Sequence, residues 1–159
     1  MSEIRQYVEI LLESLEKKLG LLQKIMAENK KQEDVLKNNR DIEIFDSTVT
    51  AKEQLIHDLE SLDSGFEKVY DRIKEELQES KETYRTQIIR MQELISEITD
   101  LSVQIQTSEQ RNKNLVDNYF SYARGKIRQA KKSVRAANDY YKSMSRTNYT
   151  DSYLMDRKK

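Results

Sequence analysis

Apolar residues near the start of the chain recur at spacings of three and four, which predicts an amphipathic helix over about 3–37. Further apolar residues widen this stripe, so we expect the helix to pack against two others. The polar segment KNNRD at 37–41 marks its end, because Asn38 or Asn39 can adopt the left-handed conformation that closes a helix. The stripe contains Ile4, Val8, Leu11, Leu15, Leu19, Leu22 and Met26, with Tyr7, Leu12, Leu21 and Ile25 beside it.

A second amphipathic pattern predicts a helix over about 50–78, preceded by a short helix at 41–48. Thr50 and Glu53 have the spacing of a capping box just before the apolar run begins at Leu55. The stripe keeps its phase across Gly65, so we expect this glycine inside the helix or at a kink. The stripe contains Leu55, Ile56, Leu59, Leu62, Phe66, Val69, Ile73 and Leu77.

The polar segment QESKET at 78–83 predicts the second reversal of the chain, and a third helix is expected over about 83–144. At about 1.5 Å per residue this helix would be roughly 90 Å long, against roughly 50 Å for each of the first two. We therefore expect its last part to overhang the bundle. Residues 145–159 have no helical period and are expected to form a flexible tail. The third stripe begins with Tyr84, Ile88, Met91, Ile95, Ile98, Leu101 and Ile105, thins at QTSEQRNKN and resumes at Leu115.

The composition favours an all-α protein. The chain has no Pro and only 3 Gly, and 36% apolar residues accompany 35% charged ones. This balance suits long helices that each bury a narrow stripe. We predict one helical domain over 1–144, an antiparallel bundle or coiled coil of three long helices.

Neither an enzyme nor a membrane protein is expected. The chain has no Cys and a single histidine, His57, so it cannot build a Cys- or His-rich metal site, and we expect no cofactor. No glycine-rich phosphate loop or hydrolase motif occurs. No stretch approaches the roughly 20 apolar residues that span a bilayer. Acidic residues interrupt the apolar positions of the N-terminus, unlike a secretory signal, so we expect a soluble, intracellular protein.

Charge changes this picture near the end of the third helix. The chain is formally neutral, yet six Lys or Arg and no acidic residue lie between Asp117 and Asp139. On a helical wheel, an apolar stripe covers about 100° and the cations cover an adjacent arc. We predict that this stripe binds a partner helix, because small residues allow close approach and Tyr and Met are common at binding surfaces. The predicted binding residues are Tyr119, Ala123, Ile127, Ala130, Val134, Ala137, Tyr141 and Met144 in the stripe and Arg124, Arg128, Lys131 and Arg135 beside it.

Three other interpretations of the basic segment remain open. The first is a bundle helix with a solvated cationic face. A membrane-surface helix is disfavoured because Ala and Val bury too little area. Nucleic-acid binding is disfavoured because acid-rich helices lie in the same chain, and residues 1–79 carry a net charge of −7.

Several stretches of the chain together form a recognisable pattern. The first are the helix VEILLESLEKKLGLLQKIMAENKKQEDVL, the polar break KNNRDIEIF and the segment TAKEQLIHDLESL. The stretch QELISEITDLSVQIQTSEQRNKNLVDNYFSYARGKI follows, and DSYLMDRKK comes last. These stretches, which cover much of the chain, resemble the FlgN-like flagellar export chaperones of Gram-positive, clostridial type, and Asn112, Asn114 and Leu115 match the general run of that family.

The resemblance implies a cytoplasmic chaperone that binds hook-associated proteins, the components of the hook–filament junction. It would keep their terminal helices from assembling early and deliver them to the flagellar type III export apparatus. The resemblance also implies that the C-terminal helix binds these clients. The alternative is a coiled-coil scaffold that self-associates without a client, and a homodimer is compatible with either interpretation. Neither nucleic acid nor membrane insertion is expected.

Overall fold

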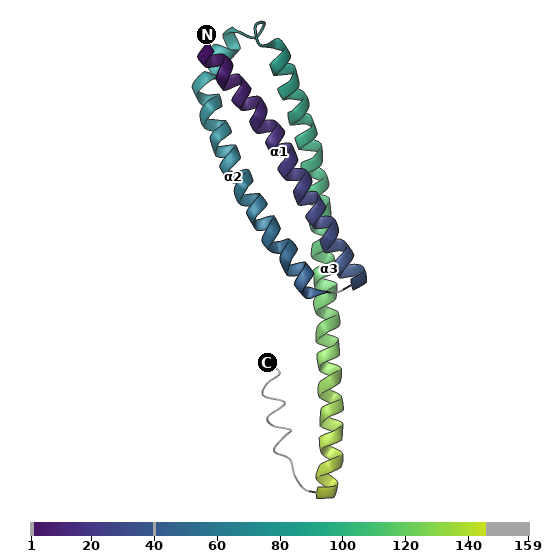
Figure 1. Ribbon diagram of the computed structural model, residues 1–159. Helices are drawn as coiled ribbons and strands as arrows, with labels where there is room; N and C mark the ends of the chain where they lie inside the picture. The colour runs from purple at the N-terminus through teal and green to yellow at the C-terminus, as the bar shows by residue number, and fades with distance from the viewer. Residues whose placement is uncertain (1, 40, 146–159) are drawn as a thin grey trace. The chain divides into compact units, whose positions relative to one another are not determined.

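In a computed structural model, the chain is all-α over the residues that the structure describes, 2–39 and 41–145, and no strand occurs there (Figure 1). This confirms the predicted fold class. The chain divides into two compact units, Met1–Leu115 (unit 1) and Val116–Lys159 (unit 2), which are described separately below. Of the predicted tail, Ser145 is the last residue of a helix, and 146–159 lie outside the described residues.

The first helix, α1, spans Ser2–Asp34 and continues directly into a π-helical turn, η1, at Val35–Asn39. Glu3 lies in the first turn and Lys31 in the last turn of α1, where each charge complements the helix dipole. Val35 and Leu36 are consecutive in sequence, and both are buried. The wider π turn rotates successive side chains by less than an α turn does, which helps two neighbouring residues face the same side.

The second helix, α2, spans Ile42–Glu79, so the short helix predicted at 41–48 is the first part of a longer one. Its N-cap is Asp41, whose carboxylate accepts hydrogen bonds from the backbone N–H of Glu43 (3.0 Å) and of Ile44 (3.4 Å). The predicted cap at Thr50 is wrong. The Thr50 hydroxyl lies inside the helix and donates back to the carbonyl of Asp46 instead. Gly65 lies inside α2, as predicted.

The second reversal of the chain lies within residues 80–84, between α2 and α3 (Arg85–Ser145). The N–H of the C-cap residue Ser80 donates to the carbonyls of Glu76 and Leu77 and so satisfies two groups at the end of α2. The N–H of Tyr84 in turn donates to the carbonyl of Ser80. Backbone hydrogen bonds therefore close this turn without glycine or proline.

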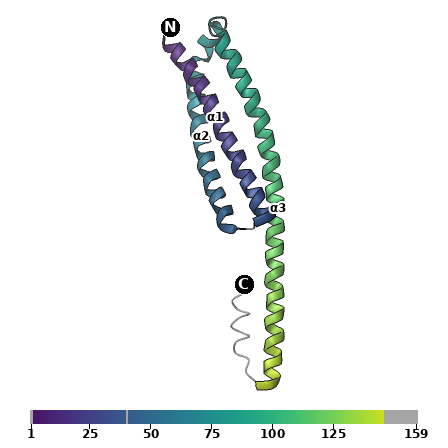
Figure 2. The ribbon, with the colours of Figure 1, turned by 45° about the vertical axis from the view of Figure 1, so that its right-hand side comes forward.

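Unit 1 is a three-helix assembly built around α1. Figures 1 and 2 show α1 running between α2 and the first part of α3. Val8 and Leu11 of α1 are fully buried, and Leu94 of α3 is 1% exposed. The wide apolar stripe predicted for the first helix thus serves both neighbours. The buried core consists of Ile4, Val8, Leu11, Leu15, Leu22, Ile25, Ile73, Leu77, Tyr84, Met91, Leu94 and Ile98.

Two residues of the predicted stripes are exposed instead of packed against this core. Ile95 is 48% exposed, and its neighbour Leu94 occupies the buried position that the sequence pattern assigned to Ile95. Ile56 of α2 is likewise 46% exposed. The spacing of apolar residues fits either neighbour, and the rotation of each helix about its axis decides which of them is buried. As a result, apolar side chains remain at the surface of unit 1.

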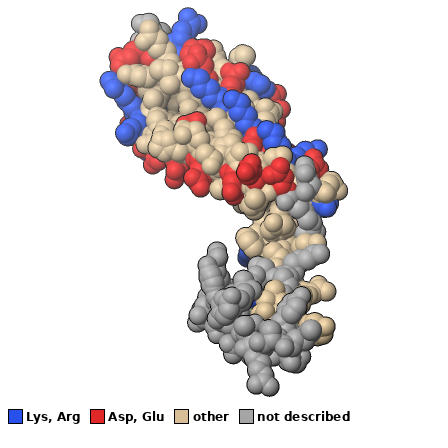
Figure 3. All heavy atoms as spheres, turned by 60° about the horizontal axis from the view of Figure 1, so that its bottom comes forward, with Lys and Arg blue, Asp and Glu red and all other residues tan. Residues whose placement is uncertain are grey.

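Ion pairs connect the helices of unit 1 at several levels. Lys18 of α1 pairs with Asp63 of α2 at 2.8 Å, and Lys52 of α2 pairs with Glu109 of α3 at 2.6 Å. Figure 3 shows Lys and Arg side chains in a row on one face of unit 1, with Asp and Glu side chains gathered along its border. Charges of both signs therefore share this surface.

Candidate functional site

The predicted binding segment lies in unit 2 and forms the C-terminal part of α3, whose helix continues to Ser145. Of its apolar stripe, Tyr119, Ala123 and Val134 are half-buried, and Ala137 is exposed. Four further members, Ile127, Ala130, Tyr141 and Met144, belong to the helix, but their side chains lie outside the described part of the structure. The described members share one face of the helix because they recur at spacings of three, four and eleven residues.

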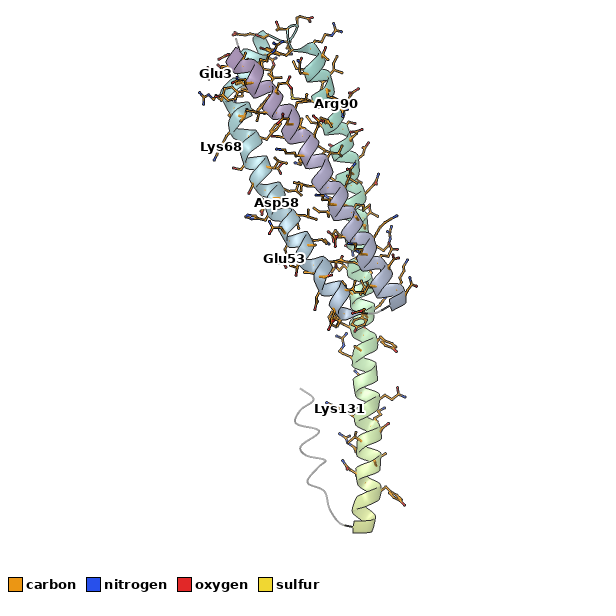
Figure 4. The ribbon with its side chains drawn as sticks, in the orientation of Figure 1. Glu3, Glu53, Asp58, Lys68, Arg90 and Lys131 are labelled. Atoms are coloured by element: carbon orange, nitrogen blue, oxygen red, sulfur yellow. The ribbon has the colours of Figure 1, made fainter. Side chains whose placement is uncertain are left out.

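The predicted cations come from the adjacent face of the same helix. Arg124, Arg128 and Arg135 are exposed, and Lys131, labelled in Figure 4, is half-buried. The Arg124 guanidinium donates a hydrogen bond to the Ser121 hydroxyl at 3.3 Å. The segment thus presents apolar and cationic faces side by side, which is an arrangement suited to binding an amphipathic helix with acidic flanks.

Aromatic residues mark the start of this segment. The rings of Tyr119 and Phe120 meet edge to face, with centroids 5.8 Å apart and an interplanar angle of 70°. Phe120 is 50% exposed and Tyr122 is 51% exposed. Large aromatic surfaces at this level add apolar area beside the stripe of small residues, and such residues contribute strongly to protein interfaces.

Searches for other kinds of site give negative results within the described residues. No group of three or more His, Cys, Asp or Glu side chains there is placed to hold a metal ion. His57 is exposed on α2. Over the same residues, no helix has an apolar stretch long enough to cross a membrane.

One carboxylate of unit 1 has a shifted pKa. A hydrogen bond from Lys37 is the largest cause of a lowered pKa at Glu33, and the charges of Lys37 and Arg111 lower it further. The Lys37 ammonium lies 2.8 Å from one Glu33 oxygen, and the Arg111 guanidinium lies 3.5 Å from the other. Glu33 therefore joins the end of α1 to η1 and α3.

The sequence profile of the family described as FlgN protein matches residues 1–151. The chain belongs to the FlgN family. This family consists of flagellar export chaperones, which bind flagellar proteins. The predicted resemblance to FlgN-like chaperones is thereby confirmed, and the Gram-positive, clostridial type stays a prediction. Neither a search of curated proteins nor a search of solved structures finds a match.

A layer of buried polar residues in unit 1 of this FlgN-family chain was not predicted from its sequence. The Asn29 amide donates to the Ser108 hydroxyl at 2.8 Å. The Asn112 amide donates to the Asn29 carbonyl at 2.9 Å and to the Gln32 side-chain oxygen at 3.2 Å. A signal was present, because the polar segments AENKKQED and QTSEQRNKN interrupt the first and third stripes. These segments lie side by side in the fold, and each directs polar side chains inward.

An apolar hollow on unit 1, between α2 and α3, was not predicted from the sequence either. Its lining includes Ile95, which the stripe pattern placed in the core. The hydrophobic pattern records that a residue is apolar, but not whether a third helix covers it. The exposure of Ile95 therefore could be learned only from the packed structure.

Proposed function

We propose that this FlgN-family protein is a cytoplasmic export chaperone whose clients are the hook-associated proteins of the hook–filament junction, held by the C-terminal part of α3. Family membership supports the general role. The single observation that carries the choice of binding surface is the separation of apolar and cationic faces on residues 119–144. The terminal helices of such clients would assemble through apolar stripes, so a chaperone must offer a competing stripe.

The apolar stripe supplies the affinity in this proposal, and the cations set approach rate and selectivity. Exposed charges such as Arg128 and Arg135 are screened within about 10 Å at 0.1 M salt, so they contribute little to the bound state. Once a client helix covers the stripe, a carboxylate placed in it would lose water without gaining a partner. That loss costs several kcal/mol, enough to abolish a complex of micromolar affinity.

The test is calorimetric titration of the full chain with purified hook-associated proteins from the same organism. The double variant Ile127→Asp/Val134→Asp is expected to lose binding by at least about 100-fold. The matched control Gln129→Asp/Ala136→Asp adds the same two charges, seven residues apart, at positions outside the stripe. It should retain binding within a few-fold.

The scaffold alternative predicts a different result. A self-associating coiled coil would form defined multimers in sedimentation runs of the chain alone, whereas a chaperone should stay small until a client is added. Equal binding by the stripe variant and its control would show that residues 119–144 do not hold the client. A sharp fall in the melting temperature of the free stripe variant would show that the stripe belongs to the protein's own core.

A further inference from the structure

The hollow between α2 and α3 of unit 1 is an apolar groove with half-exposed walls. It has a volume of about 290 Å³. Leu11 and Met91 lie at its lining among the buried residues of the core, whereas Tyr70 is 44% exposed and Ile95 is 48% exposed. The ring of Phe66 stacks on Tyr70, with centroids 6.2 Å apart, and extends the apolar wall on the α2 side. Covering these side chains would remove apolar surface from water.

The α2 wall of the groove is as long as a short helix. Its α2 wall runs from Phe66 to Gln78, with Lys81 just beyond the end of α2. At about 1.5 Å per residue, the helical part of this wall is roughly 18 Å long, which corresponds to three or four turns of a docked helix. The opposite wall comes from Ile88 and Ile95, two turns apart on α3. Two walls of this kind present holes into which apolar side chains of a helix can insert at spacings of three and four.

The charges that line the groove indicate what kind of helix fits. Both charged residues of its lining, Lys74 and Lys81, are cationic, and the remaining polar lining residues are Gln78 and Gln92. Lys74 lies 3.6 Å from Asp71, but this pair is about half exposed on both sides and is therefore weak. A docked helix with Asp or Glu at the edge that faces Lys74 and Lys81 would meet complementary charge there.

We propose that this groove binds an amphipathic α-helix of a partner protein, with an apolar face and acidic flanks. A second copy of the chain is a poorer occupant. In a symmetric dimer the same surface meets itself, so Lys74 and Lys81 of both copies would enter one interface. The groove lies wholly within unit 1, and the proposal does not depend on the stripe of unit 2 binding clients.

Two fluorescein-labelled synthetic peptides of about 18 residues are each titrated with the full chain at about 0.1 M salt. Binding is measured as the rise in fluorescence anisotropy of the peptide. Both peptides carry Leu and Ile at helical spacings of three and four. One has Glu at the flanking positions and the other has Lys. The Glu peptide is expected to bind at least about tenfold more tightly than the Lys peptide.

Matched variants locate the bound peptide. Ile95→Ser should weaken binding of the Glu peptide by about tenfold, because it removes an apolar contact from the groove. Its control, Ile89→Ser, lies on the same helix with a similar exposure of 45% but lines a different hollow, and it should leave binding unchanged. Lys74→Glu combined with Lys81→Glu should reverse the preference between the two peptides. Circular dichroism should give the same helix content for every variant.

Three outcomes would overturn the proposal. Binding unaffected by both Ile95→Ser and the lysine variants would place the peptide elsewhere. If Ile127→Asp/Val134→Asp alone abolished binding, unit 2 would hold the peptide, and the proposed function would stand without a groove site. If sedimentation showed a dimer that Ile95→Ser dissociates, the occupant would be a second copy. Loss of hook-associated protein binding in the unit 2 variant is measured separately, so failure of either proposal is recognised independently.

Discussion

Replacing Asn112 by leucine should stabilise unit 1, although it removes two hydrogen bonds. Asn112 is 4% exposed and follows Ile98 and Ile105 at seven-residue intervals on α3. Its amide nitrogen donates to the Asn29 carbonyl and to Gln32, while its side-chain oxygen has no hydrogen-bond partner among the described residues. The side chain therefore combines two satisfied donor contacts with one buried acceptor that lacks a protein partner.

The magnitude follows from three contributions. Loss of the two hydrogen bonds costs about 1 kcal/mol each. Removing the buried oxygen recovers a desolvation penalty of roughly 1–3 kcal/mol. Burying a leucine side chain, which branches at the same carbon as asparagine, stabilises the folded protein by roughly 1.5 kcal/mol or more. Asn112→Leu should therefore raise the free energy of unfolding by about 1 kcal/mol, once some loss from imperfect packing is allowed for. Asn112→Asp should lower it by about 3 kcal/mol or more at neutral pH, because a buried carboxylate would face two oxygen acceptors.

Both changes in the free energy of unfolding can be measured by urea titration, with circular dichroism as the signal. The comparison requires that the free energy of unfolding falls with urea concentration at the same slope in all the proteins. Asn114→Leu is the matched control, since Asn114 is exposed on the same helix, and its effect should stay within about 0.5 kcal/mol. A destabilisation above about 1 kcal/mol by Asn112→Leu would refute the reasoning. It would mean that the Asn112 oxygen is satisfied in the folded protein and that the layer is a complete hydrogen-bond network.

Three further predictions concern α2 and the end of α1. Gly65→Ala should stabilise the protein by about 0.5–1 kcal/mol in urea unfolding, since the glycine is helical and an added Cβ meets no atom within 4 Å; a loss of stability would contradict this. In the same urea unfolding, Asp41→Ala should lower the free energy of unfolding by about 1 kcal/mol because the N-cap is lost, whereas Asp41→Asn should keep most of that stability. Glu33→Gln tests pH dependence. The folded pKa of Glu33 is lowered, so its stabilisation is present above the ordinary value of 4.5 and is lost as pH falls through the folded value. The stability difference between wild type and Glu33→Gln should therefore vanish in acid, and a difference that persists there would exclude the ion pairs as its cause.

The candidate site on unit 2 rests on properties that are written in the sequence. A helical stripe of small and aromatic residues and an adjacent arc of cations follow from residue order and the helical period alone. The structure adds that the segment is helical to Ser145 and that Arg124, Arg128 and Arg135 are exposed. Which protein covers the stripe does not follow from either, because binding depends on a second surface.

The sequence by itself determined that the protein is all-α. Absence of proline, few glycines and stripes of period 3.5 leave long helices as the local structure that buries the apolar residues. These features are local, and they need no knowledge of the partner helix. Polar segments alone do not locate the reversals, because AENKKQED and QTSEQRNKN lie inside α1 and α3.

Only the tertiary structure decided which side chains are buried and which caps form. Leu94 rather than Ile95 enters the core because the rotation of α3 is set by its contact with α1. Asp41 rather than Thr50 caps α2 because the π turn η1 ends at Asn39 and α2 begins at Ile42, directly after Asp41. Asn29 and Asn112 are buried because their helices lie side by side at that level. The burial of Leu94, Asn29 and Asn112 depends on contacts between residues far apart in sequence, which residue spacing along one helix does not specify.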